Sequence, residues 1–162
     1  MSFIDTPVRS VMTRQVRTVE AEEPLTQCVR TMRDARIGCV VVVEGGKPIG
    51  MFTERDLISK IADAGAVSLA QPVGTAMARP LTTILPSATL WDAISLMGRL
   101  GIRRLPVVEE EKLVGILTER DIFRLILSQQ SLLLEAVSES MPAATRDQLR
   151  GIVGHFGPEK LP

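Results

Sequence analysis

The octapeptide G-M-F-T-E-R-D-L at residues 50–57 returns as G-I-L-T-E-R-D-I at residues 115–122, so the chain repeats a segment 65 positions later. The same offset holds upstream without a gap, where for example Met12 aligns with Met77. A fixed period of this kind is the signature of a repeated structural unit. Two copies of one unit usually pack about a pseudo-twofold axis, and a site in one copy then predicts a related site in the other.

Composition narrows the class of protein. The chain has 162 residues, 45% of them hydrophobic and 23% charged, which is typical of a folded globular protein. Its formal net charge is zero, so no strong field attracts nucleic acid or an anionic membrane. Aromatic residues are scarce, and no apolar run approaches the roughly 18 residues of a membrane span. We therefore expect a cytoplasmic protein that binds neither nucleic acid nor membranes.

Few side chains suit catalysis or metal binding. Cys28 and Cys39 lack the spacing of metal ligands and are interpreted as reduced, buried thiols. His155 is the single histidine and has no cysteine or histidine near it in sequence. A metal site needs several ligands with suitable spacing, and a histidine-activated nucleophile needs a partner for the histidine. The sequence therefore predicts no metal and no enzyme activity.

Each copy reads as strand, helix, strand, strand, helix. The first copy begins with a β-prone stretch at 16–19 and a helix that starts at Glu22-Glu23-Pro24. A valine-rich strand at 39–43 and a return strand at 49–52 flank a Gly-Gly hairpin turn. A second helix is expected over 53–61. The second copy predicts strands at 81–84, 105–108 and 113–117 and helices at 88–100 and 118–127.

These patterns predict an α+β fold of two pseudo-twofold-related repeats, each a small three-stranded sheet with two helices. The repeats are expected over residues 7–64 and 72–127. A helical extension is expected over 128–157, because apolar patches at 132–137 and 149–156 indicate two extra helices that need a surface to cover.

The motif that could carry chemistry is T-x-x-D, found as Thr53-x-x-Asp56 and Thr118-x-x-Asp121, where a strand ends and a helix begins. One interpretation is a capping box alone, in which the threonine oxygen accepts from a helical amide and the acid reaches back to the cap amide. Any single occurrence would favour this interpretation.

Three observations favour a ligand as well. The motif occurs twice, each time after a glycine that lets something approach the strand closely. Arg55 and Arg120 lie in the first helical turns, where the dipole disfavours a cation unless an anion is near. A helix N-terminus favours phosphate, and an aspartate there could accept from ribose hydroxyls. The two motifs therefore describe a nucleotide pocket that is compatible with capping.

The repeats resemble a tandem pair of cystathionine-β-synthase (CBS) domains, the regulatory Bateman module, over about residues 7–127. The resemblance rests on the M-x-R-x-V lead-in, the P-V-V strand and the G-h-h-T-x-x-D end, where h is hydrophobic. It implies a disc with two clefts that bind AMP, ADP or ATP, or alternatively NAD or S-adenosylmethionine, as regulatory ligands rather than required cofactors. It assigns ribose contacts to Asp56 and Asp121, phosphate contacts to Thr53 and Thr118, and edges of the adenine site to Val16 and Leu81.

The two copies differ at one place. The second has Arg103 and Arg104 where the first has Gly38 and Cys39. Because similar modules often use basic residues here to reach phosphate, the pocket near the arginines is expected to hold phosphate better. The alternative is that both arginines are solvated residues at a strand edge.

Trp91 lies one residue off the apolar stripe of its helix, which suggests an interface residue. Similar modules dimerise through their repeat helices, so we expect a homodimer; burial of Trp91 under the C-terminal helices is the alternative. The leading hypothesis is a non-catalytic regulatory protein that senses an adenine nucleotide and signals to an unknown effector protein. A ligand-free dimeric scaffold is the second hypothesis, and a detached subunit of a larger catalyst is the third.

Overall fold

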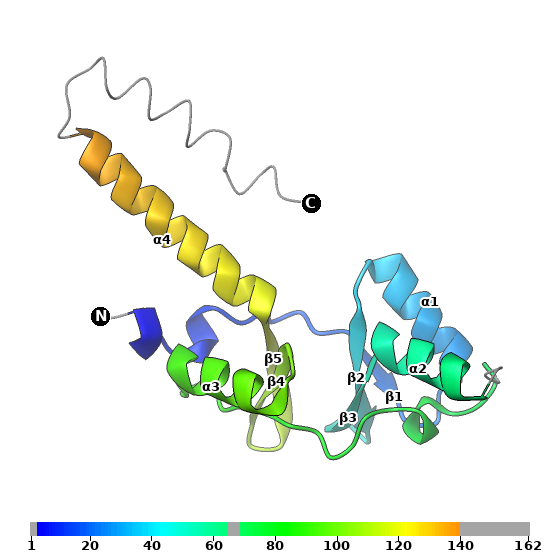
Figure 1. The fold of residues 1–162 in the computed structure, drawn as a ribbon. Helices are drawn as coiled ribbons and strands as arrows, with labels where there is room; N and C mark the ends of the chain where they lie inside the picture. The colour runs from blue at the N-terminus through cyan, green and yellow to red at the C-terminus, as the bar shows by residue number, and fades with distance from the viewer. Residues whose placement is uncertain (1–2, 65–68, 140–162) are drawn as a thin grey trace. The chain divides into compact units, whose positions relative to one another are not determined.

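The computed structural model describes residues 3–64 and 69–139. The chain divides into two compact units, residues 1–117 and residues 118–162. The first copy of the repeat contains β1 (Thr18–Glu20), α1 (Leu25–Ala35), β2 (Cys39–Glu44), β3 (Lys47–Thr53) and α2 (Glu54–Ala64). The second contains α3 (Leu90–Leu100), β4 (Arg104–Glu109), β5 (Lys112–Thr118) and α4 (Glu119–Glu139) (Figure 1). Short 3-10 turns lie at η1 (Phe3–Asp5), η2 (Val8–Ser10) and η3 (Val73–Thr75).

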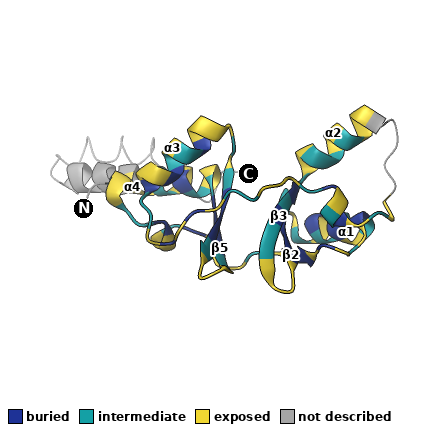
Figure 2. Ribbon diagram, turned by 90° about the horizontal axis from the view of Figure 1, so that it is seen from below, coloured by how far each residue is buried: buried dark blue, intermediate teal, exposed yellow. Residues whose placement is uncertain are grey.

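The first sheet has the strand order β1-β2-β3, with β1 parallel and β3 antiparallel to β2. Residues 40–43 of β2 are all buried, which explains the unbroken run of four valines in place of an alternating pattern (Figure 2). The apolar stripe of α1, namely Leu25, Cys28 and Met32, joins β2 and Phe52 of β3 in one core cluster. The predicted strands and helices of this copy are confirmed, with shifts of a few residues at their ends.

The second sheet is smaller than predicted. Only β4 and β5 pair as strands, and the strand expected over 81–84 is reduced to one parallel bridge between Ile84 and Val107. Ile84 donates to the carbonyl of Pro106 and accepts from the amide of Val108, each at 3.0 Å. Prolines at positions 80 and 86 flank this stretch, and because proline has no N–H to donate, pairing cannot extend across them.

Each lead-in segment packs on the other copy. Residues 6–13, which precede β1, form backbone bonds with the second copy, and residues 71–78 form the equivalent bonds with the first. The amides of Leu90, Val8 and Thr13 donate to the carbonyls of Thr6, Ala88 and Ile116 at 2.9, 2.8 and 2.9 Å. The amides of Leu25, Val73 and Ala78 donate to those of Gln71, Glu23 and Met51 at the same three distances.

The exchanged segments explain the repeated glycine that precedes each T-x-x-D motif. A β-carbon on Gly115 would lie 2.6 Å from Met12 Sδ and 3.0 Å from the carbonyl oxygen of Thr13. A β-carbon on Gly50 would overlap Met77 Sδ in the same way. Glycine is therefore required at both positions because the lead-in methionine of the other copy lies directly on the strand.

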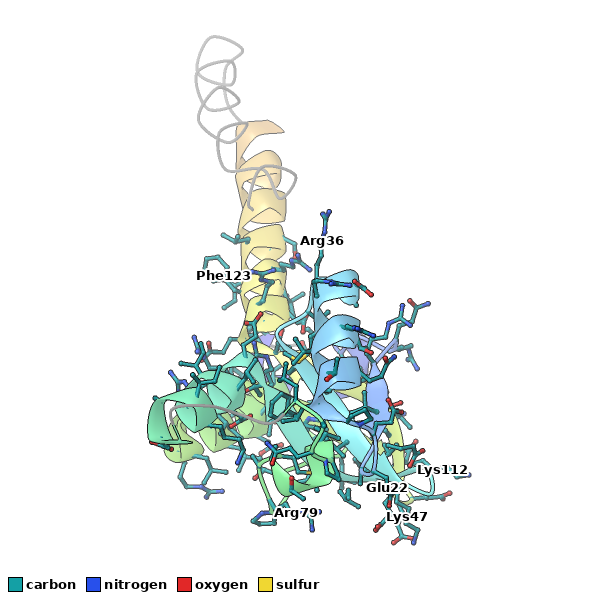
Figure 3. All side chains as sticks on the ribbon, turned by 90° about the vertical axis from the view of Figure 1, so that its right-hand side faces the viewer. Glu22, Arg36, Lys47, Arg79, Lys112 and Phe123 are labelled. Carbon is teal, nitrogen blue, oxygen red and sulfur yellow. The ribbon has the colours of Figure 1, made fainter. Side chains whose placement is uncertain are left out.

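The hairpin turns share one backbone conformation but not one sequence. Gly45 and Gly46 have φ angles of 55° and 82°, which glycine adopts without strain. In the second copy Glu110 and Glu111 have φ angles of 48° and 63°. Side chains in this region cost roughly 1–2 kcal/mol per residue. The two turns also touch, because Lys47 Nζ donates to Glu111 Oε2 at 2.8 Å; Figure 3 shows Lys47 and Lys112 at the hairpin ends.

Helix α4 differs from the prediction of a helix that ends near residue 127 followed by a separate one. It continues without interruption to Glu139, because residues 119–139 contain neither glycine nor proline. Ser128 adapts to the helix by donating its hydroxyl to the carbonyl of Leu125 at 2.8 Å. The second extra helix expected over 149–156, together with His155, lies outside the described residues. None of the helices described is long and apolar enough to span a membrane.

We predict that Gly115→Ala and Gly50→Ala each destabilise the protein by about 1–3 kcal/mol, the usual cost of an overpacked core. Urea denaturation will measure the change. Gly98→Ala is the matched control: a β-carbon there meets nothing within 4 Å in α3, so alanine should stabilise the helix by about 0.5–1 kcal/mol. If the core glycines tolerate alanine as well as Gly98 does, the methionine contact does not hold the copies together.

The hairpin provides a second prediction. Glu110→Gly should raise the free energy of unfolding by about 0.5–1 kcal/mol, because relief of the left-handed strain exceeds the extra entropy of glycine in the unfolded chain. Gly45→Ala in the first hairpin should instead lower the free energy of unfolding. Its φ is positive, and a β-carbon there meets no atom within 4 Å, so backbone strain is the only cost. Equal signs for the two substitutions in thermal or urea denaturation would contradict the explanation by backbone strain.

Candidate functional site

Both T-x-x-D motifs form the predicted capping box. In the first, Asp56 Oδ2 accepts from Thr53 N at 2.8 Å and from Thr53 Oγ1 at 2.7 Å, while Asp56 N donates to Thr53 Oγ1 at 3.2 Å. In the second, the corresponding bonds between Thr118 and Asp121 measure 2.9, 2.6 and 3.3 Å. Helices α2 and α4 begin at the residue directly after each threonine.

These three bonds hold the carboxylate in place, and they engage only one of its two oxygens. Oδ2 accepts two bonds within the motif, and Oδ1 takes part in none of the three. An ionised carboxylate has about four acceptor sites, so Oδ1 keeps the capacity to accept from a ligand. The threonine and aspartate of both motifs are half-buried, which lowers the competition from water. The arrangement suits a ligand that offers hydroxyl donors.

A third capping box shows that this geometry does not by itself indicate a ligand. At the start of α3, Asp92 Oδ2 accepts from Thr89 N at 2.9 Å and from Thr89 Oγ1 at 2.7 Å, and Asp92 N donates to Thr89 Oγ1 at 3.1 Å. The bond from the Thr89 hydroxyl, followed by that from its amide, lowers the pKa of Asp92. This box has no equivalent in the first copy, which has Pro24 and Gln27 there, and Asp92 is exposed. Burial and repetition distinguish the other two boxes.

The glycine before each motif makes room for a side chain of the other copy, not for a ligand as the sequence suggests. The structure places Met77 against Gly50 and Met12 against Gly115, so packing between the copies accounts for both glycines. The remaining support for a ligand comes from the paired motifs and the charges around them.

The other predicted residues fall into two groups. Arg55 and Arg120 are exposed in the first turns of α2 and α4, as predicted. Val16 and Leu81 are half-buried at equivalent positions that follow the two lead-ins, and the Val16 amide donates to the carbonyl of Arg14 at 3.2 Å. The described hydrogen bonds do not join either residue to a T-x-x-D motif.

Gly38 and Arg104, predicted for different pockets, lie together. A β-carbon on Gly38 would be 3.0 Å from Arg104 Nη2 and 3.0 Å from Glu54 Oε2. The amide of Glu54 donates to the Gly38 carbonyl at 3.2 Å, which fixes Gly38 at the start of α2. Arg103, in contrast, is exposed.

Glu54 was not among the site residues predicted from the sequence. Positions 39 and 104 are equivalent in the two copies, and in the structure Arg104 lies beside Gly38, the neighbour of Cys39. The charge of Arg104 in the second copy therefore acts on the residues next to Cys39 in the first copy.

The two cysteines lie in different surroundings. Cys28 is fully buried, as interpreted, and burial followed by the charge of Glu23 raises its pKa to about 11. Cys39 is half-buried; burial raises its pKa, Arg104 lowers it and Glu54 raises it. Both thiols are free. Within residues 3–64 and 69–139 no three or more metal-ligating side chains gather into a cluster.

Comparison with known proteins identifies the repeated unit. The model of the CBS domain matches residues 8–63 and again residues 73–128. The CBS domain-containing protein YhcV of Bacillus subtilis is 35% identical over 115 residues, which cover 71% of this chain and 81% of that protein.

Two longer relatives contain the matched region as a part. Protein MJ1404 of Methanocaldococcus jannaschii is 36% identical over 135 residues, covering 75% of this chain but 32% of that protein. Inosine-5'-monophosphate dehydrogenase of Korarchaeum cryptofilum is 32% identical over 140 residues, covering 86% of this chain and 25% of the enzyme. The chain thus spans about a third or less of the length of these two relatives.

Solved structures agree with the family. The CBS-domain containing protein ATU1752 of Agrobacterium tumefaciens is 31% identical with a TM-score of 0.68, covering 75% of this chain and 93% of that one. The CBS domain pair of protein MJ0100, solved with 5'-methylthioadenosine and S-adenosyl-L-methionine, has a TM-score of 0.69 and covers 76% of this chain and 98% of its own. At 21% identity the latter likeness shows the fold alone.

Proposed function

The chain belongs to the CBS-domain family, and we propose that it is a non-catalytic regulatory protein that binds an adenine nucleotide at its T-x-x-D motifs. Occupancy would be passed to an effector protein in the cytoplasm. The observation that carries this proposal is the repeated, half-buried aspartate with one oxygen engaged by the motif and the other available. The α+β fold of two CBS repeats, which the sequence predicted, supports it.

Asp56 and Asp121 are the proposed ribose ligands. The two hydroxyls of a ribose are donors, and an ionised carboxylate only accepts, so Oδ1 is the chemically matched partner. The capping bonds hold each carboxylate in place before the ligand arrives, which reduces the entropy lost on binding. Val16 and Leu81 are proposed to border the adenine.

In this geometry the threonines cannot donate to a phosphate, so another group must supply the donor. A hydroxyl has one hydrogen, and Thr53 and Thr118 already donate theirs to the aspartates. A phosphate offers only acceptors at neutral pH. The guanidinium groups of Arg55, Arg120, Arg103 and Arg104 are therefore the proposed phosphate donors.

The adenosyl compounds in the MJ0100 structure support an adenosine-containing ligand, although that likeness extends only to the fold. AMP, ADP, ATP, NAD and S-adenosylmethionine all present the same adenosine diol. The chemistry of the proposed site recognises that shared part, and the ligand is not required for folding in this proposal.

We predict that calorimetry detects at least one of these five ligands and that Asp56→Ala or Asp121→Ala weakens binding by about 1.5–3 kcal/mol, the range for hydrogen bonds to a charged group. Asp92→Ala is the matched control, because it opens a capping box of the same geometry outside the repeated motif. It should lower stability without changing affinity. Absence of heat and of thermal stabilisation with all five ligands at millimolar concentration would refute the proposed function.

We also propose a homodimer that uses the helices that follow β3 and β5. Ile58 of α2 is 66% exposed, and its equivalent in α4, Phe123, is 55% exposed; Figure 3 labels Phe123 on α4. Trp91 of α3 is 58% exposed. Exposure of large apolar side chains at equivalent positions of both copies suits a twofold interface, in which each patch meets its own symmetry mate.

Ile58→Glu and Phe123→Glu should each convert the dimer to a monomer in light scattering at micromolar concentration, because every substitution places its charge in the isologous interface twice. Leu85→Glu is the control, since Leu85 is 59% exposed but lies outside the helices. A monomeric mass for the unmodified protein, with and without nucleotide, would contradict the dimer.

A ligand-free scaffold is the second candidate function, and two observations favour it. The box at Thr89 and Asp92 caps a helix without belonging to the repeated motif, and methionines account for the glycines before both motifs. The calorimetric series above distinguishes the two functions, because a scaffold would dimerise without binding nucleotide. The chain matches a quarter of the length of a dehydrogenase, and the third candidate function is therefore a regulatory part associated with a larger enzyme.

A further inference from the structure

The two lead-in methionines occupy equivalent places in the repeat but differ in their exposure to water. Met12, which lies on Gly115, is buried, with 9% of the residue exposed. Met77, which lies on Gly50, is half-buried, although it packs against the core cluster of the first copy. Of the two side chains that join the copies, Met77 is therefore the one that a small solute can approach more easily.

The backbone bonds beside the two methionines differ in the same direction. In the second copy Thr13 and Ile116 exchange two amide bonds, each 2.9 Å long. In the first copy Ala78 donates to Met51 at 2.9 Å, but the return bond from Met51 to Ala78 is 3.4 Å long and therefore weaker. Met51 is also half-buried, whereas Ile116 is buried. The contact between residues 73–78 and β3 is thus the looser of the two, and local opening is expected to begin there.

The Met77 sulfur has no spare room on the side that faces the strand. A β-carbon on Gly50 would overlap this sulfur and would lie 3.0 Å from the carbonyl oxygen of Ala78. An oxygen atom added to the sulfur and turned toward the strand would meet the same crowding. It would also be an acceptor without a donor, because the amides of Ala78 and Met51 already donate to each other's carbonyls. Turned away from the strand, the sulfoxide would still replace an apolar contact by a polar group.

Other sulfur atoms are poorer targets for an oxidant. Burial is the main reason that the pKa of Cys28 is raised to about 11, and burial also raises the pKa of Cys39. Because the thiolate is the form that reacts, both thiols are protected at neutral pH. Every methionine of the described residues other than Met51 and Met77 is buried. An oxidant in solution therefore finds its accessible sulfur atoms at the looser contact between the copies.

We propose that Met77 is a site of reversible oxidation by peroxides and that its sulfoxide releases residues 73–78 from β3. In the reaction with hydrogen peroxide, a lone pair of the sulfur forms a bond to one peroxide oxygen and the O–O bond breaks. The departing hydroxide takes the proton of the transferred oxygen and leaves as water. The sulfur thus loses two electrons, and the peroxide gains them. Methionine sulfoxide reductases reverse this change.

The release would act on one motif only. Strand β3 ends at Thr53, the first residue of the first T-x-x-D motif. A lead-in that leaves β3 therefore removes support from this motif, while Met12 keeps its place beside the strand that precedes the second. The inference goes beyond the proposed function, because it concerns the contact between the copies and needs no ligand.

The test treats the full chain with hydrogen peroxide and follows the gain of one oxygen atom at each methionine by peptide mass spectrometry. Met77 is expected to react at least about tenfold faster than Met12, because a buried sulfur reacts only after local opening. Oxidation at Met77 is expected to lower Tm by about 2–12 °C, the usual cost of an overpacked contact in a chain of this size. Incubation with methionine sulfoxide reductase and dithiothreitol should restore Tm.

Two variants assign the effect to one sulfur atom. Met77→Leu nearly conserves the apolar volume, so it should fold and should lose the fall in Tm caused by peroxide. Met51→Leu is the matched control, because it removes the other accessible methionine from the same contact and should retain the fall. If Met12 reacts as fast as Met77, or if peroxide lowers the Tm of Met77→Leu as much as before, the inference is wrong. Complete oxidation of Met77 without a change in Tm would show that the sulfoxide fits and would overturn the release.

A second readout needs neither a variant nor an oxidant. Hydrogen exchange measured by NMR should be faster for the amide of Met51 than for that of Ile116, because the bond from Met51 to Ala78 is the longer one. Oxidation of Met77 should speed the exchange of Met51 further and leave Ile116 unchanged. Equal exchange of the two amides in the unmodified protein would contradict a looser contact in the first copy.

Discussion

The structure depends on the contact between each lead-in methionine and the glycine of the other copy. Met12 on Gly115 and Met77 on Gly50 place a side chain directly against strand backbone. Paired amide bonds run beside both contacts, at 2.9 Å in both directions between Thr13 and Ile116 and at 2.9 and 3.4 Å between Ala78 and Met51. Neither copy can then complete its packing alone, since the segment that covers its last strand belongs to the other. A small repeat unit with a modest apolar core gains stability in this way, and the two T-x-x-D motifs come to follow strands that are fixed from both sides.

The sequence predicted the parts that local physics determines. The repeat at a fixed offset gave two copies, the valines at 40–43 gave a buried strand, and the threonine and aspartate of each motif gave the capping boxes. Each of these features is determined by residues close together along the chain or by the repeat itself. The second sheet was less predictable, because the pairing of Ile84 is limited by prolines at both ends of its stretch. The length of α4 was missed because an apolar patch after Ser128 was interpreted as a new helix rather than the same one.

Contacts across the two copies could not be predicted from the sequence. The repeated glycine was interpreted as space for a ligand, and a methionine more than 25 residues away occupies that space. Gly38 and Arg104 were assigned to different pockets for the same reason. A repeat shows which positions are equivalent, but it does not show which of them face each other. That depends on how the copies pack, which small residues such as Gly38 and Gly50 permit without indicating the partner.

The position of Arg104 has a general consequence for a fold built from two similar copies. If the copies were identical, the residues at positions 39 and 104 would be the same, and any charge beside one motif would be matched beside the other. Here a thiol and a guanidinium occupy the equivalent positions, and the guanidinium reaches across to the first copy. A difference of one residue pair where the copies meet is therefore enough to give related motifs unlike electrostatic surroundings, while their capping bonds stay the same to within 0.1 Å. Duplication preserves the geometry that holds each aspartate, while single residues where the copies meet change the charges around one motif.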